Sequence, residues 1–182
     1  MELRFIAERM RQRVRRSSNF ASIAWSPRFV DIPPGGRFLV LAPHPDDDVV
    51  GCGGTILKLL AVGKSVRIAY LSLQSSVDFA RAERLAEIER SLVILGVKDF
   101  SFLAESFPPE DRLMSLLEKE ISSRKYDSVF LPSPIENHDQ HTALFWAFHR
   151  LNGRKVIWDM NAILYEVWTP PSSRTCSSTY RR

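Results

Sequence analysis

The amino-acid sequence is poor in cysteine and in uninterrupted apolar segments. Its 182 residues include only two cysteines, Cys52 and Cys176, and this number and spacing argue against a disulfide framework or a zinc finger. Apolar residues near the N-terminus are separated by charged ones, so neither a signal peptide nor a membrane span is predicted. Together these absences favour a reducing compartment, and we expect a cytoplasmic protein.

Basic residues are scarce where a nucleic-acid-binding protein needs them. The net charge is +4, but residues 1–30 hold seven Arg against two Glu and residues 172–182 hold three Arg. Residues 31–171 contain fifteen basic and nineteen acidic residues. This acidic body argues against a nucleic-acid partner, because binding to phosphates requires basic residues gathered on one face of the domain. The basic extension, residues 1–30, is predicted to be a solvated helix, and weak contact with an anionic membrane surface or a partner is the alternative.

The remaining chain has the length and pattern of one α/β domain. A Pro- and Gly-rich breaker at 31–36 precedes the predicted domain, residues 37–168, and a polar tail that we expect to be disordered, residues 171–182, follows it. Short apolar runs alternate with amphipathic ones, which predicts a Rossmann-like three-layer fold with a mostly parallel sheet and helices on both faces. Nothing indicates the oligomeric state. The expected strands are 37–42, 65–73, 99–103, 128–131 and 162–167, and the expected helices are 53–62, 78–95, 109–123 and 142–151.

A histidine and three adjacent aspartates follow the first predicted strand. His44 is separated by one proline from Asp46, Asp47 and Asp48. Three neighbouring carboxylates repel one another, and a cation would stabilise them. An imidazole and a carboxylate within four residues form half of a zinc site. The alternative is an acidic cap on the next helix, since these aspartates would lie near its positive end.

A second histidine pair, His138 and His141, follows the strand predicted at 128–131. Three of the four histidines therefore follow predicted strands, and open α/β sheets bind ligands at the carboxyl ends of their strands. A nucleotide-binding reading of Gly51–Gly54 is disfavoured, because Gly-Cys-Gly-Gly differs from Gly-x-Gly-x-x-Gly and the preceding aspartates would repel a pyrophosphate.

These motifs resemble the PIG-L/LmbE-like deacetylases, the family of N-acetylglucosaminyl-phosphatidylinositol deacetylase and of the deacetylases of bacterial thiol biosynthesis. The resemblance covers roughly residues 37–168. It is carried by Pro43–Asp48 with Gly53-Gly54-Thr55, by Arg84 and Glu87 before Leu95-Gly96, and by the spacing of His138 and His141.

The resemblance implies a zinc-dependent hydrolase that removes an acetyl group from an N-acetylated amino sugar, an N-acetylglucosamine-type conjugate. It implies Asp46 as general base and His138 as the group that stabilises the oxyanion. It also implies that Arg84 reaches the substrate or a site carboxylate, and the alternative for Arg84 is a surface salt bridge. Other divalent metals such as Fe²⁺ or cobalt also suit His and Asp ligands. The implied zinc ligands are His44, Asp47 and His141.

Four departures from the family pattern are visible. Asp48 replaces the usual Glu, and Gln140 replaces an Asp that would serve His138. Residues 73–76 lack a Thr-x-Gly sequence, and the polar residues 171–182 stand where relatives continue with further elements, as a truncated or frameshifted end would. The alternative function is therefore a catalytically impaired, metal-binding relative.

Overall fold

A computed structural model of the chain describes residues 31–73, 78–153, 160–167 and 179–180. The helix expected in residues 1–30 and nearly all of the polar tail lie outside these residues. None of the helices in the described part of the chain has the length and apolarity that a membrane span requires.

Among the described residues, six strands form one sheet in the order β3-β2-β1-β4-β5-β6. The first five strands are parallel, and the two-residue β6 pairs antiparallel with β5. The central strand β1 lies between β2 and β4, so Phe38 is in register with Val66 on one side and Ser128 on the other. The strand bounds are β1 Arg37–Ala42, β2 Ser65–Ser72, β3 Asp99–Ala104, β4 Ser128–Pro132, β5 Asn161–Tyr165 and β6 Thr179–Tyr180.

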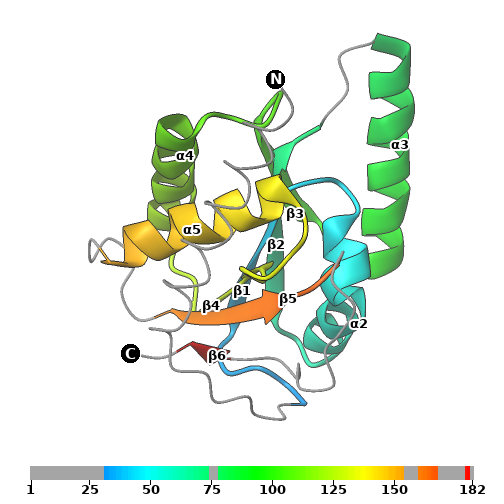
Figure 1. Ribbon diagram of the computed structural model, residues 1–182. Helices are drawn as coiled ribbons and strands as arrows, with labels where there is room; N and C mark the ends of the chain where they lie inside the picture. Colours follow the sequence, from blue (N-terminus) through cyan, green and yellow to red (C-terminus); the bar gives the residue numbers. More distant parts are fainter. Residues whose placement is uncertain (1–30, 74–77, 154–159, 168–178, 181–182) are drawn as a thin grey trace, which may run out of the picture.

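Helices cover both faces of this sheet, as Figure 1 shows. Because side chains of a strand alternate between faces, the apolar run of β1 contributes to two cores. Phe38 and Val40 pack with α2 and α3, whereas Leu39 and Leu41 pack with α4 and α5. The predicted three-layer α/β fold is confirmed. The helix bounds are α2 Asp47–Ala61, α3 Asp78–Leu95, α4 Glu110–Ser123 and α5 Asp139–Gly153.

Two helices begin earlier than the sequence pattern predicts. Helix α2 begins at Asp47 rather than Gly53, and α5 begins at Asp139 rather than Thr142. Glycine has low helix propensity, so the pattern predicts a later start, whereas Gly51 lies within α2 and packs closely against Tyr165. A Cβ atom on Gly51 would lie 2.3 Å from Cδ2 of Tyr165. The earlier starts place acidic residues in the first turns, where the positive end of a helix stabilises them.

The order of the strands also locates a topological switch point. The chain leaves β1 toward β2 on one side, and β4 lies on the other side. Helix α2 follows β1 and α5 follows β4, so the carboxyl ends of β1 and β4 form the topological switch point at which open α/β sheets bind ligands.

Candidate metal centre

Three histidines meet at the carboxyl ends of β1 and β4. His44 follows β1, His138 follows β4, and His141 lies in the first turn of α5. The ring centroid of His138 lies 4.8 Å from the ring centroids of both His44 and His141. The ring centroids of His44 and His141 are 5.2 Å apart. One nitrogen from each ring lies within 4.8 Å of the others. Two motifs separated by almost 100 residues in the sequence therefore form one cluster.

The three predicted zinc ligands form a nearly equilateral triangle. His44 Nδ1 lies 3.2 Å from Asp47 Oδ2, and His141 Nε2 lies 3.3 Å from both of these atoms. A tetrahedral zinc ion with bonds of about 2.0–2.1 Å separates its ligand atoms by about 3.3 Å. All three side chains are buried. The donor set and its spacing therefore fit a zinc ion and leave a fourth position open.

The charge of Asp47 suits this role. Burial raises the pKa of its carboxyl, but the hydrogen bonds from His141 and His44 outweigh burial and bring the pKa down to about 2. Its Oδ2 also accepts a hydrogen bond of 2.8 Å from the backbone N–H of His44. Asp47 is thus ionised at neutral pH, and its contacts with His44 and His141 hold it in place.

Asp46 lies at the rim of the cluster beside Arg84. One of its carboxylate oxygens is within 4.8 Å of donor atoms of His44 and Asp47, and its side chain is 58% exposed. Arg84 Nη2 of α3 donates to Asp46 Oδ2 at 3.2 Å, while Nη1 donates to Glu87 at 3.2 Å. Asp46 precedes α2, but its side chain makes no capping hydrogen bond. Its carboxylate therefore faces the rim of the cluster, where Arg84 is its partner.

The pKa values of His138 and His44 are shifted in opposite directions. Burial lowers the pKa of its ring, and the neighbouring His141 and His44 lower it further. A neutral imidazole carries one N–H and is a hydrogen-bond donor without a net charge. In His44 the balance is opposite: burial lowers the pKa, but hydrogen bonds to Asp47 and Gln140 raise it above the ordinary value.

The sequence does not predict two contacts of this region. Gln140 occupies the position where the family resemblance implies an Asp that would serve His138. Its Oε1 lies 2.5 Å from Nε2 of His44. Tyr70, which reads as one more apolar residue of β2, donates from its hydroxyl to Asp48 Oδ2 at 3.0 Å. Burial raises the pKa of Asp48 to about 6. Asp48 therefore anchors α2 to the sheet. In the sequence, the hydroxyl of Tyr70 within an apolar run is the one feature that could have indicated this contact.

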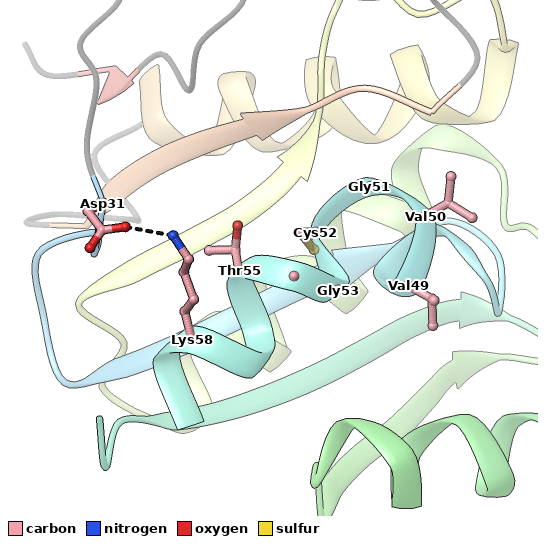
Figure 2. Close-up of a pocket in the computed structure, with 9 residues that line it drawn as sticks. Asp31, Val49, Val50, Gly51, Cys52, Gly53, Thr55 and Lys58 are labelled. Atoms are coloured by element: carbon pink, nitrogen blue, oxygen red, sulfur yellow. Dashed lines mark hydrogen bonds and ion pairs between the residues drawn. The ribbon is translucent and has the colours of Figure 1, made fainter. Parts of the chain in front are cut away.

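A separate hollow of about 350 Å³ lies along α2 (Figure 2). An ion pair of 2.6 Å between Lys58 and Asp31 closes one end of it. None of the histidines or Asp47 lines this hollow. Cys52, which does line it, donates its thiol to the Asp48 carbonyl, and burial raises the pKa of the thiol. The hollow therefore lacks the reactive groups of the metal centre.

Known proteins share this fold and these motifs. Residues 39–151 match the family described as GlcNAc-PI de-N-acetylase, PIG-L. The chain is 33% identical over 125 residues to the diacetylchitobiose deacetylase of Thermococcus kodakarensis, a match that covers 58% of this chain and 45% of that protein. The chain thus spans less than half the length of this curated relative.

Two solved structures extend the comparison. The conserved protein TT1542 of Thermus thermophilus has a TM-score of 0.61 and 28% identity, over 74% of this chain and 68% of that chain. The N,N'-diacetylchitobiose deacetylase of Pyrococcus horikoshii, complexed with its inhibitor MPG, has a TM-score of 0.59 and 25% identity, over 71% and 60%. The region that matches the family includes both histidine motifs.

Proposed function

Because this chain belongs to the PIG-L family, we propose that it is a metal-dependent hydrolase that removes an acetyl group from an N-acetylated amino sugar. The observation that carries the proposal is the triangle of donor atoms from His44, Asp47 and His141, with edges of 3.2–3.3 Å. The names of the two diacetylchitobiose deacetylases support a substrate of the N-acetylglucosamine type.

The metal is proposed to be zinc, held by the three donor atoms of this triangle. Bound zinc supplies Lewis acidity, which polarises an amide carbonyl and lowers the pKa of water. Fe²⁺ is the alternative, because two imidazoles and a carboxylate also suit iron. Asp46 and His138 would lie beside an ion held by this triangle, since both have donor atoms within 4.8 Å of those of His44.

Two side chains at the rim are proposed to move the proton and hold the developing charge. Asp46 accepts a proton from the water that attacks the amide carbon, and Arg84 keeps this carboxylate oriented through its 3.2 Å contact. His138 donates its N–H to the carbonyl oxygen as negative charge develops there. The C–N bond then breaks, the amine takes the proton from Asp46, and acetate leaves.

The test compares wild-type protein with Asp46→Asn and His44→Ala. Zinc content is measured together with acetate release from N-acetylglucosamine and N,N'-diacetylchitobiose. We expect about one zinc per chain in wild type and Asp46→Asn, and a loss of activity of about 10²–10⁴-fold in Asp46→Asn because general base catalysis contributes that much. His44→Ala should lose both metal and activity. Glu105→Gln, an exposed carboxylate that is also paired with an arginine, is the matched control.

Each outcome of this test separates the alternatives. Unchanged activity in Asp46→Asn would refute its role as base, and absence of metal from wild type would refute the site. Zinc binding by wild type without acetate release would favour a catalytically impaired, metal-binding relative. The cytoplasmic location and the absence of a nucleic-acid partner stay predictions, supported by two cysteines in the chain and by the acidic residues 31–171.

A further inference from the structure

We propose that Gln140 is a positioning residue that holds His44 in the tautomer required for binding the metal. The contact joins residues 96 positions apart: Gln140 Oε1 lies 2.5 Å from His44 Nε2. Gln140 is half-buried in the first turn of α5, one residue before His141. This inference rests on the proposed metal site and adds to it a residue that does not itself ligate.

The direction of the hydrogen bond decides which nitrogen of His44 binds metal. An imidazole presents a lone pair at one nitrogen when the other nitrogen carries the proton. The amide oxygen of Gln140 accepts a hydrogen bond from Nε2–H, which leaves the lone pair on Nδ1. Nδ1 is the nitrogen that faces Asp47 Oδ2 and His141 Nε2 across 3.2 and 3.3 Å. The contact thus orients both the ring and its lone pair toward the triangle.

A neutral amide provides this hydrogen bond without adding charge. Asp46 and Asp47 already place two carboxylates beside His44. A carboxylate at position 140 would also accept from Nε2–H, and in addition would raise the basicity of the ring and the affinity for a cation. The residue at position 140 therefore affects the affinity for metal independently of the three ligands. Glutamine gives a lower affinity than an acidic residue would.

The test uses Gln140→Met, which keeps the length of the side chain and removes the acceptor, and Gln140→Glu, which keeps the acceptor. Asp139→Asn, a polar change in the same helical turn, is the control. Zinc affinity is measured by competition with a fluorescent chelator, and Co²⁺ is bound in place of zinc so that its absorption bands report the ligand geometry. Thermal melting without metal shows whether each variant is folded.

We expect Gln140→Met to bind zinc about 10–100-fold more weakly, as loss of such a supporting hydrogen bond does in other sites. Its Co²⁺ bands should shift, whereas Gln140→Glu should bind at least as tightly as wild type and Asp139→Asn should match wild type. Equal zinc affinity and an unchanged Co²⁺ spectrum in folded Gln140→Met would refute this inference alone. A wild-type protein that binds neither metal would refute the proposed function as well.

Discussion

Replacement of Arg67 by methionine is expected to destabilise the domain by about 3–5 kcal/mol while leaving the metal centre intact. Arg67 lies near the start of β2, at the opposite end of the sheet from the histidines. Its Nε donates to Glu120 Oε1 at 2.6 Å and its Nη2 to Ser101 Oγ at 2.7 Å. Nη1 pairs with Asp99, and Glu120 also accepts the hydroxyl of Tyr126 at 2.9 Å.

The magnitude follows from the burial of the cluster. The side chains of Arg67 and Glu120 are 11% and 8% exposed, so loss of the guanidinium leaves a buried carboxylate without its cation. Breaking one partner of such a pair costs about 3–5 kcal/mol, whereas replacing both by apolar groups is often nearly neutral. Methionine retains most of the apolar stem, so packing changes little. Relative to a usual stability of about 5–15 kcal/mol, the loss is severe.

The assay is urea denaturation at pH 7 of wild type, Arg67→Met and the double variant Arg67→Met with Glu120→Met. The double variant should regain most of the free energy of unfolding that the single variant loses. A single-variant loss below about 1 kcal/mol, typical of exposed ion pairs, would refute the reasoning. So would a double variant that is no more stable than the single one. Zinc content per folded chain should stay at the wild-type value in both.

The pH dependence provides a second test of the same cluster. Burial raises the pKa of Glu120, but the hydrogen bonds from Arg67 and Tyr126 outweigh burial and hold it below the ordinary value. The carboxylate of wild type therefore contributes stability above about pH 4.5, and this contribution is lost as the pH falls through the lower folded pKa. Without Arg67 the hydrogen bond from Tyr126 remains, but the largest effect opposing burial is lost, so protonation of Glu120 relieves the variant. The destabilisation by Arg67→Met should be smaller at pH 4 than at pH 7.

Two further predictions concern α2 and the metal. Gly51→Ala should destabilise the domain by about 1–3 kcal/mol or more, since its Cβ would meet Tyr165 at 2.3 Å. A Cβ on Gly54 would meet nothing within 4 Å, so Gly54→Ala should be neutral or stabilising by up to about 1 kcal/mol. Equal effects of the two substitutions on the free energy of unfolding in urea would contradict the packing of Gly51 against Tyr165. Zinc at a thousandfold excess over Kd should stabilise by about 4 kcal/mol and raise Tm by about 8–16 °C. A similar rise in His141→Ala would show that zinc binds elsewhere.

Much of the fold was predictable because its strands are short apolar runs. Such runs occur where both faces of a strand are buried, and the alternation with amphipathic segments indicates a parallel sheet. The start of α2 was not predictable in the same way. Gly51 has low helix propensity, which favours a helix start after it, whereas the packing against Tyr165 selects glycine at position 51 within the helix. Tertiary contact thus overrode local propensity.

The candidate site shows the same division. The strand pattern predicts that the loops after the first strand and the strand at 128–131 meet at one edge of the sheet, and the family resemblance implies His44, Asp47 and His141 as the ligands there. Their distances of 3.2–3.3 Å agree with that expectation. The contact from Gln140 to His44 depends on how the first turn of α5 is rotated against the loop after β1, and one sequence holds no signal of that rotation.

The two ends of the sheet differ in how buried charge is balanced, and this difference supports a metal at the carboxyl end. At the amino end, Glu120 has the guanidinium of Arg67 within 2.6 Å. At the carboxyl end, the ionisable groups that pair with Asp47 in the described part of the chain are the imidazoles of His44 and His141, whereas Arg84 pairs with the more exposed Asp46. A carboxylate that is 2% exposed needs a compensating positive charge. Protonation of a histidine supplies one charge in the absence of metal, and a divalent ion supplies two while leaving both imidazoles neutral. Zinc binding should therefore release protons, measurable as acidification of a weakly buffered solution, and no proton release on binding would contradict this charge balance.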